Sequence, residues 1–189
     1  MLASLTTTNG AAPDAPVQSA QLDPVSNMVF FLSSATNLLP GALGGVQHLY
    51  GFDPVSRTLR RLSQAPSGEA ANADTTAFSL AAEAGKLVLR TQASNLEGGP
   101  GLYLLDLETG TRRPLLTALQ HGGSDPGADN PVLGTTAQGL AFDAPDAAGR
   151  LQVFTAALGE SGLHDLRQET PIDGQSIEAC CAALSGDGS

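Results

Sequence analysis

Basic residues are scarce in this chain of 189 residues. It has one lysine, Lys86, and eight arginines against nineteen acidic residues, so its formal net charge is −10. Nucleic acids and anionic membrane surfaces are bound by clustered Lys and Arg side chains. The charge balance therefore argues against a nucleic-acid partner and against attachment to an anionic membrane.

Long hydrophobic runs and a cysteine framework are also lacking. No run approaches the length of about 18 apolar residues that a membrane-spanning helix needs. Residues 1–8 have neither a basic region nor an apolar core, so they do not form a signal peptide. The only two cysteines, Cys180 and Cys181, are adjacent and cannot build a set of disulfides. Cysteine content thus leaves the cellular compartment open.

What the chain does have is a hydrophobic content of 41% and an internal repeat. This composition and length suffice for a folded domain with a sizeable core. Residues 34–38 return as residues 92–96, and residues 49–53 return as residues 102–106, a period of about 60 residues. Such repeats are stacked copies of one structural unit that cannot bury its apolar face alone.

The segments between the predicted loops have the length and composition of β-strands. Residues 29–32 and 87–89 are short apolar runs, typical of strands that are buried on both faces. Residues 53–56 and 106–110 have the polar, Pro- or Gly-bearing composition of hairpin turns. No window has the capped amphipathic pattern of a helix. Each repeat is therefore predicted to form four antiparallel strands.

Four-stranded antiparallel units of this size predict an all-β fold, an incomplete β-propeller arc of about three blades. The third unit is expected to begin with a strand at residues 135–140, which resemble residues 75–80, and to continue with a strand at residues 149–154. The predicted boundaries are 1–16 for the remnant of a connector between blades, 17–63 for blade 1, 64–74 for a connector, 75–117 for blade 2, 118–134 for a connector, 135–178 for a degenerate blade 3, and 179–189 for the first strand of a further blade.

The motifs resemble those of the TolB-like propeller repeats of bacteria, also called WD40-like or PD40 repeats. These repeats carry an S-x-D-G turn, a V-x-F strand, an S-x-A-x-N-L loop, a Y-x-x-D strand and a T-G turn. Their counterparts here are residues 184–188, 28–31, 33–38, 102–106 and 109–111. In the first two units the S-x-D-G turn is replaced by residues 23–27 and 81–85.

The resemblance implies a non-catalytic propeller scaffold that binds protein or another macromolecule. It also implies a bacterial protein of the periplasm or the exterior, whose export signal would lie upstream of Met1. Because propellers close with about four to eight blades, the chain is expected to be a fragment with an open edge available for self-association. Two copies that close one ring together are the alternative. The competing function is the gating propeller of a prolyl-oligopeptidase-like hydrolase, whose Ser-Asp-His domain is absent from these residues.

No pattern in the chain indicates a catalytic residue, a cofactor or a metal site. The three histidines, His48, His121 and His164, lie in unrelated segments without the spacing of metal ligands. Ser161 lacks the G-x-S-x-G context of an activated serine and is interpreted as a turn residue.

The candidate binding residues lie in loops that are expected to share one face of the propeller. Asn37 and Asn95 recur at one loop position, which indicates a structural duty such as bonding to their own backbone. Asp125, Asp129 and Asn130 form the most acidic loop, whose oxygens suit Ca²⁺. They do not follow the D-x-D-x-D-G order, so an ordinary solvated loop is the favoured interpretation. Because these loops vary most in length, a partner is expected to bind there.

Two further repeated pairs complete the pattern. Tyr50 and Tyr103 are expected to pack between blades with their hydroxyls near the rim. Arg60 and Arg113, on the fourth strand of their units, are expected to be exposed.

Overall fold

The computed structural model describes residues 12–41, 44–118 and 121–169. In these residues the regular structure is twelve β-strands and one short 3-10 helix. They fall into two compact units, one of residues up to Thr75 together with Ala93–Glu97, and the other of Thr76–Gln92 and the residues from Gly98 onward. None of the described helical structure is long and apolar enough to cross a membrane.

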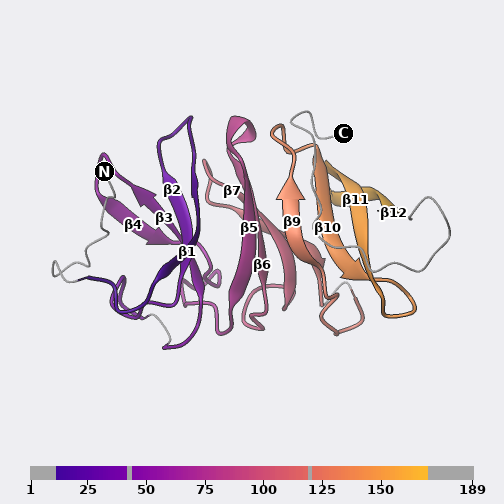
Figure 1. The fold of residues 1–189 in the computed structure, drawn as a ribbon, viewed down its shortest axis with the longest axis horizontal. Helices are drawn as coiled ribbons and strands as arrows, with labels where there is room; N and C mark the ends of the chain where they lie inside the picture. Colours follow the sequence, from indigo (N-terminus) through magenta and orange to yellow (C-terminus); the bar gives the residue numbers. More distant parts are fainter. Residues whose placement is uncertain (1–11, 42–43, 119–120, 170–189) are drawn as a thin grey trace. The chain divides into compact units, whose positions relative to one another are not determined.

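The first unit is built on one four-stranded antiparallel sheet, which we call blade 1 (Figure 1). Its strands, in the order in which they pair, are β1 (Val17–Leu22), β2 (Val29–Ser33), β3 (His48–Asp53) and β4 (Thr58–Arg61). On β2, the side chains of Phe30, Phe31 and Leu32 are all buried although they alternate between the two faces of the sheet. The predicted burial of this strand on both faces is confirmed.

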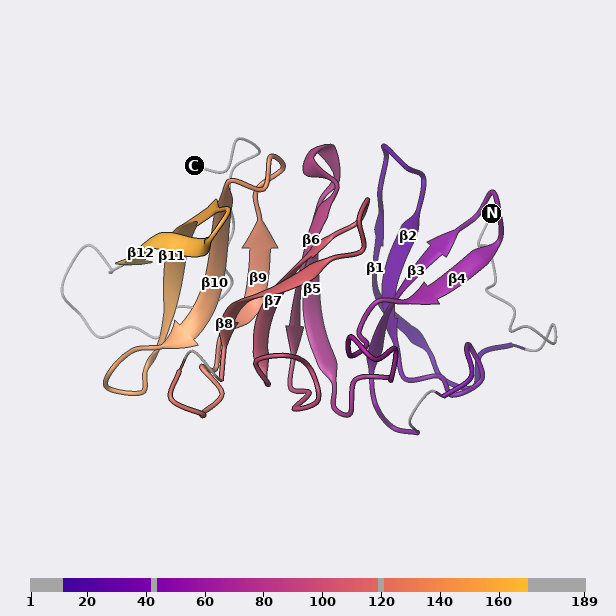
Figure 2. The ribbon, with the colours of Figure 1, turned by 180° about the vertical axis from the view of Figure 1, so that it is seen from behind.

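The second unit contains two sheets of the same kind, blades 2 and 3, which Figures 1 and 2 show from opposite sides. Blade 2 consists of β5 (Thr75–Ala81), β6 (Lys86–Thr91), β7 (Gly101–Asp106) and β8 (Arg112–Thr117), with the 3-10 helix η1 (Ala82–Ala84) between the first two strands. Blade 3 consists of β9 (Asp129–Leu133), β10 (Gly139–Pro145), β11 (Leu151–Gly159) and β12 (Gly162–Glu169).

A shared apolar core holds blades 2 and 3 together. Blade 2 contributes Val88, Leu102 and Leu104, and blade 3 contributes Leu140 and Phe142, all of them buried. Burial of a side chain of this size stabilises a fold by roughly 1.5–3 kcal/mol. Neither sheet could bury these side chains alone, which is why the repeated units stack.

An aspartate closes each tight hairpin turn at the ends of β3 and β7. The Asp53 carboxylate accepts a hydrogen bond from the backbone N–H of Val55 at 2.8 Å, and Asp106 accepts one from that of Thr109 at 2.9 Å. This bond from Thr109, the nearby Lys86 ammonium and the Thr109 hydroxyl hold the pKa of Asp106 well below its ordinary value. The aspartate of the Y-x-x-D motif is therefore a turn residue.

Blade 3 begins earlier than the sequence predicts. Its first strand is β9, which lies inside the predicted connector 118–134. The predicted first strand at residues 135–140 is therefore wrong, because residues from Gly139 onward belong to the second strand, β10. Residues 149–154 accordingly lead into the third strand, β11. The sequence did not predict β9 as a strand because it begins with polar residues and contains Pro131. Proline is tolerated there because β9 pairs only with β10 and is an edge strand. The predicted strand at 179–189 and both cysteines lie outside the described residues.

Candidate functional site at the loop end of the blades

Each blade has two unlike ends. At the turn end, short turns join the first strand to the second and the third to the fourth. At the loop end of blades 1 and 2, longer loops join β2 to β3 and β6 to β7, beside the connectors that lead into each blade. Asn37 and Asn95 lie in these two loops, and Asp125 lies in the connector that leads into blade 3. The loop end of the first unit, to which Asn37 and Asn95 belong, is therefore the candidate functional site.

The repeated asparagines fasten the loop of a blade to the connector that precedes it. Asn95 donates from Nδ2 to the carbonyl of Ala70 at 2.8 Å and accepts from the backbone N–H of Asn72 at 3.0 Å. Asn37 makes the same pair of bonds with the connector before blade 1, at 2.8 and 3.1 Å. The observed bonds go to a segment more than twenty residues away. The asparagines thus have a structural duty, but the expected hydrogen bonds to their own backbone are wrong, because the partner is the connector.

The residue before each repeated asparagine, Ser94 or Thr36, also forms hydrogen bonds with the connector. Asn72 accepts from the backbone N–H of Ser94 at 2.9 Å and donates from Nδ2 to the Ser94 hydroxyl at 2.9 Å. In blade 1, the Asp14 carboxylate accepts from both the backbone N–H and the hydroxyl of Thr36. The bond from the Thr36 hydroxyl lowers the pKa of Asp14. Side chains thus fix the connectors to the loops in the same manner in both blades.

Replacing Asn95 with alanine is expected to lower the free energy of unfolding by about 1–2 kcal/mol, because two hydrogen bonds to backbone groups are lost at a partly exposed site. Urea denaturation followed by circular dichroism measures this change. The matched comparison is Asn95→Asp, which keeps the acceptor for Asn72 but sets a carboxylate oxygen against the Ala70 carbonyl, so it should be at least as destabilising as Asn95→Ala. An Asn95→Ala variant as stable as the wild type would contradict the proposed fastening.

A buried polar cluster lies beneath the loop end of blade 1. The side chain of His48, on β3, is fully buried, and its Nδ1 lies 3.4 Å from the hydroxyl of Ser63. Its ring meets that of Tyr50 edge to face, with centroids 6.2 Å apart. Burial, and next the positive charge of Arg61, lower the pKa of His48 to about 4. The imidazole is therefore neutral at pH 7.

Arg61 is the second member of this cluster. Its guanidinium is almost completely buried and donates to the carbonyl of Pro40 at 3.0 Å and to that of Gly41 at 3.4 Å. Beside it lies a hollow with a volume of about 410 Å³. The residues that line this hollow are Pro40, Gly41, Arg61, Gly68, Glu69, Ala70, Asn72 and Asn95. The Arg61 guanidinium and the connector that Asn95 fastens therefore line the same hollow at the loop end of the first unit.

Sequence reasoning did not single out His48 or Arg61. A signal was present, because both depart from the repeat. The register pairs Tyr50 with Arg61 in blade 1 and Tyr103 with Pro114 in blade 2, and Gly101 starts the blade 2 strand where His48 starts that of blade 1. The blade fold does not require a cation or an imidazole at these positions.

The acidic loop does not assemble into a cation site. The Asp125 carboxylate lies 2.7 Å from Nη2 of Arg90, whose side chain is almost completely buried. Asp129 accepts from the backbone N–H of Asn130, while the side chain of Asn130 donates to the Asp143 carboxylate, each at 2.9 Å. Their oxygens are thus directed to different partners. In the described part of the chain no group of three or more His, Cys, Asp and Glu residues is placed to hold a metal ion.

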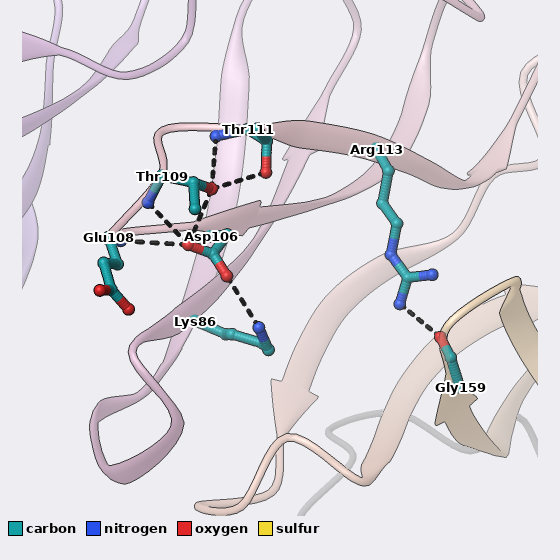
Figure 3. A network of polar contacts seen from close by, with 7 residues as sticks. All are labelled: Lys86, Asp106, Glu108, Thr109, Thr111, Arg113 and Gly159. Carbon is teal, nitrogen blue, oxygen red and sulfur yellow. Dashed lines mark hydrogen bonds and ion pairs between the residues drawn. The ribbon is translucent and has the colours of Figure 1, made fainter.

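A second hollow, of about 510 Å³, lies at the turn end of the second unit. Figure 3 shows three of its charged side chains, Lys86, Asp106 and Arg113, in their contacts. Lys86 forms an ion pair of 2.9 Å with Asp106, and Arg113 donates to the carbonyl of Gly159 at 2.5 Å. Because it bonds to the β11–β12 turn, Arg113 is half-buried, so its predicted exposure is wrong, whereas Arg60 is exposed as predicted. Arg113 thus bonds blade 2 to blade 3, whereas the Lys86–Asp106 pair joins two neighbouring strands of blade 2.

The repeated tyrosines are buried. Tyr50 stacks on Phe31 of the neighbouring strand of its own blade, with ring centroids 5.5 Å apart, and burial raises the pKa of its phenol. Tyr103 donates its hydroxyl hydrogen to the carbonyl of Gly99 in the β6–β7 loop. The Tyr103 hydroxyl therefore lies at the loop end of blade 2.

The described residues form three four-stranded antiparallel sheets, one after another along the chain, and the only other regular structure in them is η1. This is an all-β, propeller-like fold of blades. No protein-family model and no curated protein matches the sequence. Solved structures match it well. The structure of TolB from Acinetobacter baumannii does so with a TM-score of 0.60 and 15% identity, over 96% of this chain and 39% of TolB.

Two other solved structures extend the likeness. The β-propeller domain of the Trilobed protease from Pyrococcus furiosus has a TM-score of 0.54 at 9% identity, over 84% of this chain and 44% of its own. A chain of the nidogen–laminin complex has a TM-score of 0.52 at 10% identity, over 83% of this chain and 49% of its own. The predicted propeller fold and its likeness to TolB are confirmed, and the chain spans less than half of each of these structures.

Proposed function

We propose that the chain is a non-catalytic β-propeller scaffold whose loop end binds a protein or another macromolecule. The observation that carries this proposal is the double fastening of connectors to loops by Asn37 and Asn95 and their neighbours. A surface whose loops are already held in place loses little conformational entropy when a partner binds. Binding residues also tend to lie on loops that a rigid scaffold positions.

The side chains presented at the loop end indicate what kind of partner it suits. Glu69 and Glu97 are exposed at the loop end of the first unit, and the chain's one lysine, Lys86, does not belong to that unit. Complementary charge steers association and disfavours wrong partners. A partner with a basic or neutral contacting surface is therefore favoured. The nidogen–laminin structure adds an analogy, because it contains a chain of similar fold in a complex.

A second candidate is the propeller part of a larger peptidase, which the similarity to the Trilobed protease propeller favours. The pair Ser63 and His48 does not supply the chemistry, since both side chains are fully buried and a substrate cannot reach the hydroxyl. In this alternative the loop end would face a catalytic domain, so its contacts would be made with that domain.

Site-specific photo-crosslinking in the cells that produce the protein tests the proposal. A photoreactive residue is placed at Glu69 or Glu97, exposed at the loop end of the first unit, and at Val55 or Arg57, exposed at its turn end. The expected result is one partner captured from both loop-end positions and from neither turn-end position. Capture of a peptidase domain would favour the alternative. Equal capture from both ends, or no capture, would contradict loop-end binding.

A further inference from the structure

A buried guanidinium without a carboxylate partner lines the hollow in the first unit. The hydrogen bonds of Arg61 go to two backbone carbonyls, those of Pro40 and Gly41, and its buried Nε has no partner among the described residues. Two acids act on the cluster electrostatically, Asp14 and Asp74. Each accepts from a backbone N–H at 2.7 Å, and in the described residues neither forms an ion pair with Arg61. A buried charge that no opposite charge compensates lowers the stability of a fold.

Two neutral groups beside Arg61 also lack an acceptor. Nε2 of His48 and the hydroxyl of Tyr50 are buried, and neither has a hydrogen-bond partner in the part of the chain that the structure describes. The Ser63 hydroxyl accepts from the backbone N–H of Leu49 at 3.0 Å, so its own hydrogen is available to Nδ1 of His48. The proton of the neutral imidazole is therefore assigned to Nε2. All three unpartnered groups thus carry a hydrogen and lack an atom to accept it.

The repeat does not account for this cluster. An aromatic residue on the third strand of each blade pairs with a residue of the fourth strand, and these pairs are Tyr50–Arg61, Tyr103–Pro114 and Phe154–Gln168. Blades 2 and 3 therefore fold without a charged side chain at the position of Arg61. A buried polar group that the protein leaves unsatisfied calls for another explanation, such as a bound ion or water.

The hollow beside the guanidinium has the size and polarity of a small-ligand site. Its volume of about 410 Å³ lies within the range of about 300–1,000 Å³ that is usual for ligand pockets. All of its lining residues belong to the first unit. Asn72 and Asn95 are among them, and their hydrogen bonds between loop and connector fix that part of the wall. The hollow is therefore formed before any ligand enters it.

We propose that this hollow is a binding site for a carboxylate group, whose oxygens accept hydrogen bonds from the Arg61 guanidinium. Guanidinium and carboxylate are both planar and pair through parallel N–H···O bonds. The charge of the guanidinium favours an anion over a water molecule as the missing acceptor. Glu69 also lines the hollow and is exposed, so it disfavours the second negative charge of a phosphate. The proposal holds whether or not a macromolecule binds at the loop end.

An NMR titration of the full chain at pH 7 and constant ionic strength tests the proposal. The probe is N-acetylglycine, and N-acetylglycinamide is the matched probe that lacks the carboxylate. The wild type should bind N-acetylglycine with a dissociation constant of about 1–10 mM, and the amide at least about tenfold more weakly. The Hε–Nε signal of Arg61 should shift with the acid. Acetate distinguishes the sources of the carboxylate: equal affinity indicates a small carboxylic acid, and weaker affinity indicates the end of a peptide chain.

Two variants assign the binding to one guanidinium. Arg61→Met removes the charge but keeps an unbranched side chain, and it should raise the dissociation constant for N-acetylglycine at least about tenfold. The matched control, Arg60→Met, removes the same charge from the preceding, exposed residue and should leave the constant unchanged. Circular dichroism checks that each variant is folded, and Arg61→Lys, which lacks the planar fork, replaces Arg61→Met if the latter is not.

Several outcomes would overturn the proposal. No shift of the Arg61 signal at about 100 mM N-acetylglycine would mean that the hollow holds water only. Equal binding of the acid and its amide would show that the carboxylate is not recognised. Tighter binding of inorganic phosphate would indicate a site for phosphate. Equal losses of affinity in Arg60→Met and Arg61→Met would indicate unspecific attraction between charges.

Discussion

Replacing Gly101 with alanine is expected to prevent blade 2 from folding, or to lower its free energy of unfolding by at least about 3 kcal/mol. Gly101 begins β7 with a φ of +148°, a conformation that residues with a side chain rarely adopt. A Cβ at this position would lie 2.1 Å from the carbonyl oxygen of Leu116 and 2.6 Å from Cα of Thr117. Both atoms belong to the backbone of β8, with which β7 pairs, so the clash is relieved only by separating the two strands.

The matched control is Gly110→Ala in the β7–β8 turn of the same blade. Gly110 also has a positive φ, of +70°, but a Cβ there would meet nothing within 4 Å. Its replacement should cost about 1–2 kcal/mol, the cost of the left-handed conformation alone. Urea unfolding of the two variants and the wild type separates the clash from the backbone preference. Equal losses in the two variants would show that the close approach to β8 is not what requires glycine at position 101.

The blade architecture could be predicted because it is encoded locally. Short apolar runs such as that around Phe31 specify strands buried on both faces, and Asp53 and Asp106 specify hairpin turns by bonding to backbone groups two and three residues on. Repetition of these signals then indicated stacked sheets. The solved propellers of similar fold agree with this, although their identities to the chain are 15% or less.

The features that escaped prediction depend on contacts between distant segments. The sequence shows that Asn95 recurs, but only the structure shows that it bonds to the connector at Ala70. Likewise β9 contains a proline and starts with polar residues, and it is a strand because β10 offers it an edge. His48 and Arg61 form a cluster only after β3 and β4 pair. In each case the tertiary partner decides the role of the residue, and the local pattern does not.

Lowering the pH from 7 to 4 is expected to destabilise the first unit because His48 must stay neutral in the folded state. Its pKa falls from the ordinary value of 6.5 to about 4, through burial first and the charge of Arg61 second. Between these values the unfolded chain binds a proton that the folded chain excludes, so stability is complete above pH 6.5 and is lost as the pH falls toward 4. A shift of this size corresponds to about 3 kcal/mol at pH 4.

Three carboxylates with lowered pKa values affect only the acid end of this window. The pKa values of Asp14, Asp53 and Asp106 are lowered from 3.8, so the stability that they contribute declines from about pH 5 downward, whereas that of His48 begins to fall near pH 6.5. Urea unfolding at pH 7, 6, 5 and about 4 should therefore show a decline in the wild type that His48→Gln largely removes. The control His164→Gln, at an exposed histidine, should keep the decline. A decline that persists in His48→Gln would mean that groups other than this buried imidazole govern the acid sensitivity of the first unit.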